Sequence, residues 1–253
     1  MAATPAARVA ALYDIHGNLP ALDAVLAEID SLGIDLIVVG GDIASGPQPR
    51  ETLGALRSRS DAVFIRGNAD RELAVGAPPP ESEAALLAWE WTTGHLDDDQ
   101  RTWLAGLDFS LTVEVEGLGS VLFCHGSPRS DEEIITRLSS AERIGPMLEH
   151  VDEEVVVCGH THVQFDRSVG GKRVVNSGSV GMPYEAAPGA YWTLITNEIE
   201  LRRTEYNLEE AAALIEAMGV VESEKLIEIL KRPPPPDETS AFFEEMAAAR
   251  AKD

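Results

Sequence analysis

The sequence has few cysteines and no long apolar run. Only two of its 253 residues are cysteine, Cys124 and Cys158, too few for the disulfide framework of a small secreted protein. No apolar stretch approaches the roughly 18 residues that a membrane-spanning helix needs. Residues 1–7 lack the basic and then apolar order of a signal peptide. We therefore expect a cytoplasmic protein with no membrane partner.

Positive charge is the other scarce feature. Against 43 Asp and Glu residues there are only 20 Lys and Arg residues, which gives a formal net charge of -23. A sequence-independent hold on long DNA or RNA requires cationic side chains that neutralise phosphates, so we expect no long nucleic acid as a partner. The net charge does not exclude a small phosphate-bearing substrate, because a bound metal ion can invert the local field.

Apolar patterning predicts an α/β fold. In the first half, short β-branched runs alternate with stretches of helical spacing, which indicates parallel strands joined by crossover helices. The second half is richer in antiparallel strands. Strands are expected at residues 8–13, 36–39, 63–65, 110–115, 120–124, 155–158, 165–169, 172–176, 190–196 and 198–206. Helices are expected at residues 19–32, 50–59, 81–93, 97–106 and 139–149.

The composition changes after residue 206, so we divide the chain into a main domain, residues 1–206, and a helical C-terminal extension, residues 207–253. Asn207 and Glu210 resemble a capping box for a helix that ends near Gly219. A second helix is expected at about 223–231 and an amphipathic one at 241–252. The last helix would pack on its own domain, contact a second copy of the chain in a homo-oligomer, or fray as a tail.

Polar residues that can bind metal ions recur where the predicted strands end. The strand at 155–158 leads into Gly159-His160-Thr161-His162. In an extended segment, residues i and i+2 point to the same side, so both imidazoles are expected to aim at one location. The remaining candidates follow four other predicted strands: Asp14 and His16, Asp42, Asn68, and His125.

These seven side chains have the donor chemistry of a two-metal site. Carboxylate, imidazole and amide groups suit Mn, Fe, Zn, Ni or Co. Seven donors are too many for one tetrahedral zinc ion, but they suit two ions that share a bridging carboxylate. Paired ions of this kind activate water and hold phosphoryl oxygens. Each motif alone can also be explained as a turn or a cap, and their repetition at successive strand ends favours the metal site.

The order of the motifs resembles that of the calcineurin-like metallophosphoesterases, and most closely the small bacterial and archaeal phosphodiesterases among them. The motifs that carry the resemblance are Asp14-x-His16, Gly41-Asp42, Gly67-Asn68, His125-Gly126, Gly159-His160-Thr161-His162 and Asn176-Ser177-Gly178-Ser179-Val180-Gly181. The resemblance implies two packed mixed β-sheets flanked by helices, a four-layer αββα sandwich. It extends to about residue 206 and does not cover the C-terminal extension.

The resemblance also implies a role for each motif residue. The two ligand groups would be Asp14, His16 and His162 for the first ion and Asn68, His125 and His160 for the second, with Asp42 as the bridge. Two divalent metal ions would hold a bridging hydroxide for in-line attack on phosphorus. Mn is the first choice of metal, and Fe, Zn, Ni, Co or Mg are the alternatives. Asp42, Asn68 and His125 would act in catalysis by positioning this hydroxide and the phosphate. The implied activity is that of a phosphodiesterase on a small phosphoester, with a phosphomonoesterase as the alternative.

One position departs from the family's pattern. Many members have Gly-Asn-His-Asp at the third motif, where the histidine protonates the leaving group, but this chain has Ala69 in that place. Positioned proton transfer contributes about 10²–10⁴-fold, so alkoxide leaving groups are expected to be served poorly unless another donor replaces the histidine. The absence also favours a third hypothesis, a metal-binding scaffold with little catalysis.

Three further residues are candidates for contacts with the substrate. His95 or a metal-bound water could replace the missing proton donor, although a helix-cap histidine at the surface is the alternative. Arg66 and Arg71 flank the third motif and could contact phosphate oxygens. Solvated or ion-paired arginines are the alternative for both.

Overall fold

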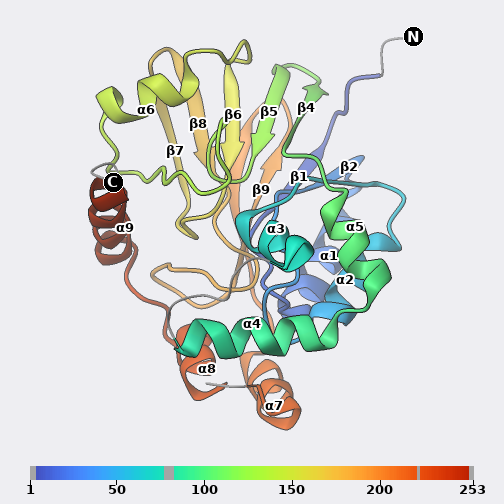
Figure 1. Ribbon diagram of the computed structural model, residues 1–253. Coiled ribbons are helices and arrows are strands. Elements are labelled where there is room, and N and C mark those ends of the chain that lie inside the picture. Colours follow the sequence, from blue (N-terminus) through green and yellow to red (C-terminus); the bar gives the residue numbers. More distant parts are fainter. Residues whose placement is uncertain (1–3, 77–82, 221–222, 251–253) are drawn as a thin grey trace.

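The computed structural model describes residues 4–76, 83–220 and 223–250, and in this part of the chain two five-stranded sheets pack face to face (Figure 1). The first sheet contains β1 (Val9–Leu12), β2 (Leu36–Val39), β3 (Ala62–Phe64), β9 (Ala190–Ile195) and β10 (Ile199–Thr204). The second contains β4 (Ser110–Val115), β5 (Gly119–Cys124), β6 (Val155–Cys158), β7 (Phe165–Val169) and β8 (Lys172–Asn176). All predicted strands are confirmed, with small differences at their ends.

Both sheets are mixed. The first has the order β10-β9-β1-β2-β3, with β1, β2 and β3 parallel and β9 antiparallel to its neighbours. The second has the order β4-β5-β6-β8-β7, with β5, β6 and β8 parallel and the two edge strands antiparallel. In α/β sheets, binding groups collect beyond the carboxyl ends of parallel strands, and here two such sets of strand ends face each other.

Helices lie on the outer sides of the sheets and at the C-terminus (Figure 1). They are α1 (Leu19–Leu32), α2 (Pro49–Arg57), α3 (Asn68–Val75), α4 (Glu83–His95), α5 (Asp98–Ala105), α6 (Ala141–Leu148), α7 (Leu208–Met218), α8 (Ser223–Lys231) and α9 (Pro236–Arg250). Within the described ranges, none of them combines the length and the apolar character that a membrane crossing requires.

Two helix predictions need correction, and two bounds cannot be compared. The sequence patterns did not indicate α3, which begins within the third motif. The predicted start of α9 at 241 is wrong, because the helix begins at Pro236, and proline is well suited to a first turn, where its missing N–H is not needed. The predicted start of α4 at residue 81 and the predicted end of α9 at residue 252 lie outside the described residues.

Alternate residues of β1 contribute to two different cores. Ala10 and Leu12 pack on the side of α1, whereas Val9 and Ala11 pack between the sheets, in the same cluster as Phe123 of β5. All of these side chains are buried. A third core lies between the second sheet and α6. The layers are therefore helix, sheet, sheet and helix, which confirms the predicted αββα sandwich.

The C-terminal helices pack back onto the rest of the chain. α7 contacts α1 and shares a small core with α8. On α9, Glu244 Oε1 accepts hydrogen bonds from Thr136 Oγ1 and Arg143 Nη2, both at 2.6 Å, and Arg250 donates to the carbonyl of Glu132 at 3.0 Å. The last helix thus docks on its own chain, while its contact with a second copy stays a prediction.

Candidate metal centre

The loops that carry the candidate ligands have an unusual backbone conformation. Non-glycine residues seldom adopt positive φ, and such residues concentrate at functional sites. Among the described residues, the non-glycine residues with positive φ are Asp14 (52°), His16 (47°), Asp42 (50°), His160 (66°) and His162 (57°). Every one of them is a predicted ligand, so the strained backbone and the polar motifs coincide.

The expectation that His160 and His162 lie in an extended segment is wrong. Both residues are left-handed, and the N–H of Thr161 donates to the carbonyl of Gly159 at 2.8 Å, which makes a three-residue turn. The strand rule that places i and i+2 on one side does not apply to such a turn. The two imidazoles enter different donor groups.

The first donor group consists of Asp14, His16 and His162, whose donor atoms all lie within 4.8 Å of one another. The Nε2 atoms of His16 and His162 are 3.1 Å apart, and His162 Nε2 is 3.2 Å from Asp14 Oδ1. The Nδ1 atoms point the other way: His16 Nδ1 donates to the carbonyl of Ser45 at 3.1 Å and His162 Nδ1 to that of Met182 at 2.7 Å. These bonds orient both rings and leave Nε2 free as a ligand.

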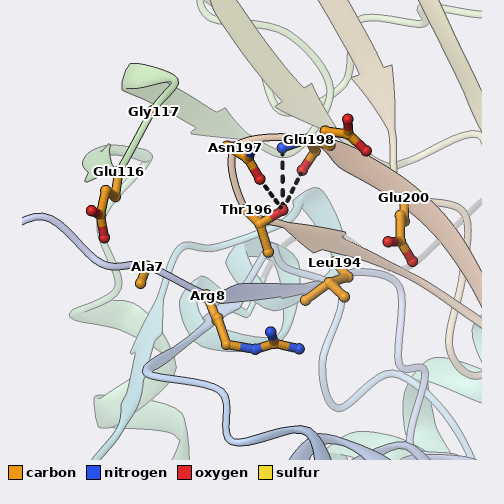
Figure 2. A pocket seen from close by; sticks show the side chains of 9 residues that line it. All are labelled: Ala7, Arg8, Glu116, Gly117, Leu194, Thr196, Asn197, Glu198 and Glu200. Atoms are coloured by element: carbon orange, nitrogen blue, oxygen red, sulfur yellow. Dashed lines mark hydrogen bonds between the residues drawn. The ribbon is translucent and has the colours of Figure 1, made fainter.

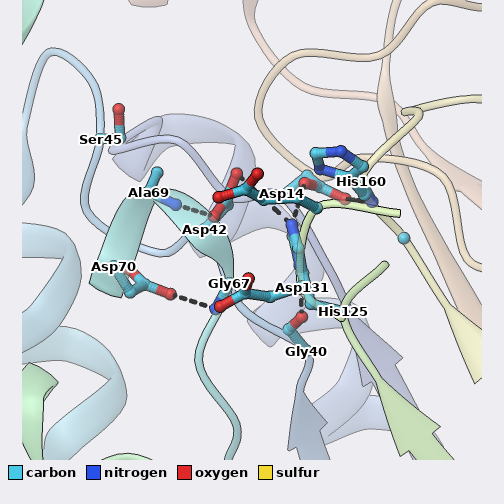
Figure 3. Close-up of polar contacts among 12 residues, drawn as sticks. Asp14, Gly40, Asp42, Ser45, Gly67, Ala69, Asp70, His125, Asp131 and His160 are labelled. Carbon is cyan, nitrogen blue, oxygen red and sulfur yellow. Dashed lines mark hydrogen bonds and ion pairs between the residues drawn. The ribbon is translucent and has the colours of Figure 1, made fainter. Parts of the chain in front are cut away.

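The second donor group consists of Asp42, His125 and His160, again within 4.8 Å. Figure 3 shows these side chains beside Asp14. His125 Nε2 lies 3.6 Å from Asp42 Oδ2, and His125 Nδ1 donates to the carbonyl of Gly40 at 2.9 Å. The other oxygen of Asp42 accepts the backbone N–H of Ala69 at 2.9 Å, so the start of α3 holds this carboxylate in place.

Both carboxylates lie between the two groups. Asp42 Oδ2 is 3.9 Å from His16 Nε2 of the first group, and Asp14 Oδ1 is 3.8 Å from His125 Nε2 of the second. Asp14 Oδ2 in turn accepts the backbone N–H of His160 at 2.8 Å. The two groups therefore form one continuous site rather than two separate ones.

Three buried atoms of the predicted ligands have no hydrogen-bond partner in the described part of the chain: Asp14 Oδ1, Asn68 Oδ1 and His125 Nε2. An unpaired buried polar atom costs about 1–3 kcal/mol. Oxygen and imidazole nitrogen are donors that divalent cations accept. The residues present therefore fit divalent metal ions.

The charges of the site balance one another through His125. Burial alone would lower the pKa of His125, but the negative charges of Asp42 and Asp14 outweigh it and raise that pKa to about 10. Against the effect of burial, His125 in turn keeps the pKa of Asp42 well below its usual range. Burial, together with the charge of His125, lowers the pKa of His160 to about 4. Without a cation, a proton on His125 thus compensates the buried carboxylates.

The comparison with known families agrees with this geometry. The calcineurin-like phosphoesterase superfamily domain matches residues 8–198, a span that contains all seven candidate ligands. The chain belongs to this superfamily. The helices α7, α8 and α9 lie beyond the matched residues.

Solved structures of this superfamily fold resemble the chain over most of their length. A metallophosphoesterase from Sphaerobacter thermophilus is 26% identical with a TM-score of 0.71, covering 88% of this chain and 98% of that one. The hypothetical protein PH1004 from Pyrococcus horikoshii OT3 is 23% identical with a TM-score of 0.78, covering 88% of this chain and 97% of that one. By sequence alone, the chain is also similar to the protein MJ0912 of Methanocaldococcus jannaschii, with 27% identity over 227 residues, which are 80% of this chain and 89% of the relative.

Asp70 connects the second and third phosphoesterase motifs. Its Oδ1 accepts the N–H of Ile43 at 3.0 Å. Its Oδ2 accepts the N–H of Gly67, also at 3.0 Å (Figure 3). Burial, followed by the charge of Asp42, raises its pKa to about 7. Asp70 holds the first turn of α3 against the loop of Asp42.

The stretch at 176–181 fastens the first and the fifth motif. Asn176 Nδ2 donates to the carbonyl of Gly159 at 2.6 Å and to Thr161 Oγ1 at 3.0 Å. Ser179 Oγ donates to the carbonyl of Asp14 at 2.6 Å. These bonds fix the strained loops of both motifs, which explains why this stretch accompanies the ligands.

The structure does not bring Arg66, Arg71 and His95 into the donor groups. Arg71 Nε donates to Asp131 at 2.9 Å, and Arg66 Nε lies 3.6 Å from the same carboxylate. His95 Nδ1 contacts the carbonyl of Trp91 in its own helix at 2.7 Å, and the two rings are tilted by 32° with their centroids 4.1 Å apart. The geometry thus favours the alternatives of ion-paired arginines and a histidine at a helix end.

Tyr184 is a neighbour of the site that the sequence patterns do not indicate. Its ring stacks on His162 at a centroid distance of 4.9 Å and an angle of 17°. Phe243 of α9 lies 6.4 Å from the ring of Tyr184. The C-terminal extension thereby reaches a ligand histidine through one aromatic contact, which no spacing rule along the chain could indicate.

Proposed function

We propose that this protein is a phosphodiesterase that depends on two divalent cations, with Mn²⁺ the first choice. The observation that carries the proposal is the pair of donor groups, each within 4.8 Å, with three buried donor atoms that lack partners. When bound, such a cation pair supplies a nucleophile from water at neutral pH and Lewis-acid stabilisation of phosphoryl oxygens.

The chain's own residues would hold and orient this centre. Asp14, His16 and His162 would hold one cation, and Asn68, His125 and His160 the other, with Asp42 shared. Backbone carbonyls fix the imidazole rings of His16, His162 and His125. Ala69 offers no proton, so we infer a preference for leaving groups that depart as stable anions.

The charge around the site supports a diester rather than a monoester as the substrate. A diester carries one negative charge per phosphate, whereas a monoester carries close to two at neutral pH. The chain has a net charge of -23, and Arg66 and Arg71 are engaged with Asp131. Apart from the two proposed cations, a second negative charge on the substrate would therefore meet little compensation from these arginines. Because Cys124 and Cys158 are buried free thiols, we further propose a reducing, cytoplasmic location.

Turnover of aryl esters tests the proposal. The purified full chain with Mn²⁺ should hydrolyse bis(4-nitrophenyl) phosphate with a higher kcat/KM than 4-nitrophenyl phosphate, and a chelator should abolish both activities. Asp42→Ala should be inactive, whereas Asp98→Ala, at an exposed carboxylate on α5, should behave as wild type. A higher kcat/KM for the monoester would indicate a phosphatase. Two bound metal ions without turnover of a broad ester panel would indicate a scaffold.

A further inference from the structure

A cavity of about 280 Å³ lies directly beside the first donor group. His16 forms part of its wall, so a group bound in the cavity would be adjacent to the candidate ligands. The segments that build the rest of the wall are far apart in the sequence: the loop after β2, α4, the loop after β8, and α8. The cavity is lined by His16, Ser45, Gly46, Pro47, Ala88, Trp91, Met182, Val220, Lys225, Leu226 and Ile229.

The wall is chiefly apolar. Trp91 presents its large ring, and its only polar atom is already used, because Nε1 donates to the carbonyl of Pro47 at 3.3 Å. Leu226 and Ile229 of α8 add aliphatic surface. The ring of His95 contacts that of Trp91 at a tilted angle and helps to set the position of the indole. Lys225 also lines the cavity, but it has an interaction partner of its own. The apolar remainder of the wall favours an uncharged organic group over water or a second phosphate.

The cavity and the donor group share their supports. Ser45 and Met182 line the cavity, and their carbonyls accept the Nδ1 protons of His16 and His162. The loops that orient two candidate ligands are therefore the same loops that shape the wall. A substrate whose phosphorus lies at the donor groups could extend one ester substituent into this space.

A larger cavity elsewhere does not have this relation to the site. It has a volume of about 710 Å³ and lies near Arg8, at the opposite end of β1 from Asp14 (Figure 2). Its lining includes Glu116, Glu198 and Glu200, and these carboxylates would repel an anionic substrate. Proximity to the candidate ligands, and not size, distinguishes the cavity beside His16.

We propose that the cavity beside His16 binds an uncharged aromatic ring of nucleobase size, carried by the ester group of the substrate that does not leave. The volume equals that of roughly nine water molecules at about 30 Å³ each. It lies just below the roughly 300–1,000 Å³ of pockets for drug-sized ligands, which suits one ring system rather than a longer polymer. The inference deepens the proposed function and rests on it for the orientation of the substrate.

Binding of a nucleoside to the metal-free full chain tests the cavity independently of catalysis. In calorimetric titrations, adenosine should bind and ribose should not. Ala88→Phe fills the cavity from an exposed helix position, and it should weaken adenosine binding by about tenfold or more, as expected when a ring loses its apolar site. Ala213→Phe makes the same change on α7, outside the cavity, and should leave binding unchanged. Trp91→Leu, with its fold checked by thermal unfolding, provides the second variant.

Two substrates with the same leaving group test the orientation. With Mn²⁺, the kcat/KM for thymidine 5′-(4-nitrophenyl phosphate) should exceed that for methyl 4-nitrophenyl phosphate by about tenfold or more. Ala88→Phe should bring this ratio close to one, and Ala213→Phe should preserve it.

Different results would contradict the cavity proposal and the phosphodiesterase proposal. Absence of adenosine binding, or binding that neither Ala88→Phe nor Trp91→Leu changes, would overturn the cavity proposal even if diesters are hydrolysed. Adenosine binding that both variants weaken, without turnover of any ester, would support the cavity and contradict the phosphodiesterase.

Discussion

The two donor groups differ in how firmly the fold holds them. In the first, His16 and His162 are both anchored through Nδ1 to backbone carbonyls, and their Nε2 atoms are 3.1 Å apart. In the second, His125 is anchored in the same way, but the ring of His160 has no hydrogen-bond partner among the described residues. The fold assembles the first group on its own, whereas a cation would complete the second.

The chain segments behind each group explain the difference. The first group comes from two loops, after β1 and after β6, which the stretch at 176–181 connects. The second takes Asp42, His125 and His160 from three loops, after β2, β5 and β6. Because more segments must be placed together, we expect the second group to bind its cation less tightly.

Loss of His160 has the largest expected effect and tests this difference directly. His160→Ala should retain one equivalent of Mn²⁺ after dialysis instead of two, because the anchored group remains intact. Its diesterase activity should fall by more than about a hundredfold, since even the loss of residues that only support ligands costs 10–100-fold. Metal analysis and initial rates provide the measurement. His150→Ala, at an exposed histidine outside the site, is the control. Retention of both equivalents in His160→Ala would contradict the comparison.

Substitution of Ala69 by histidine tests whether the site lacks a proton donor for the leaving group. Ala69→His keeps the backbone N–H that Asp42 accepts and adds the missing proton donor. Turnover of diesters with alkoxide leaving groups should rise by about tenfold or more, the lower part of what positioned proton transfer can contribute, while 4-nitrophenyl esters should change little. Ala69→Gln is the control, because glutamine is close to histidine in size but cannot act as a general acid. Equal gains for both kinds of leaving group would show that proton donation is not the missing element.

Loss of the contact between Tyr184 and the first donor group is expected to have the smallest effect, a change in Mn²⁺ affinity. Tyr184→Ala removes the ring that stacks on His162. It should weaken the binding of Mn²⁺ at the first donor group by about tenfold, as the loss of residues that support metal ligands does. Tyr184→Phe preserves the ring and should bind as wild type. Mn²⁺ titrations of the two variants give the comparison. An equal loss in both would assign the effect to the phenol hydroxyl rather than to stacking.

Much of the site could be predicted because polar motifs at strand ends meet in space. Asp14, Asp42 and His125 follow strands whose carboxyl ends face one another, so sequence patterns and the resemblance to a family placed them together. Asn68 was predicted as a loop residue, and the helix that it begins was missed, because Gly67 and Asn68 are as typical of turns as of helix starts.

Other parts of the site depend on contacts that no pattern along the chain encodes. The turn at Gly159 separates His160 from His162, and its strained backbone relies on Asn176 for support. Trp91 and Tyr184 reach the site only because α4 and the loop after β8 fold over it. These positions follow from packing, which local spacing does not describe.

The sequence by itself determined which candidate donors are present and in which order, and the resemblance to the family implied that a proton donor is absent at Ala69. Strand periodicity and motif order suffice for that, because they are local properties. Only the tertiary structure decided how the donors divide into an anchored and a less anchored group, and that an apolar cavity opens beside His16. Both depend on segments distant in sequence, whose positions are set by the packing of two sheets and the C-terminal helices.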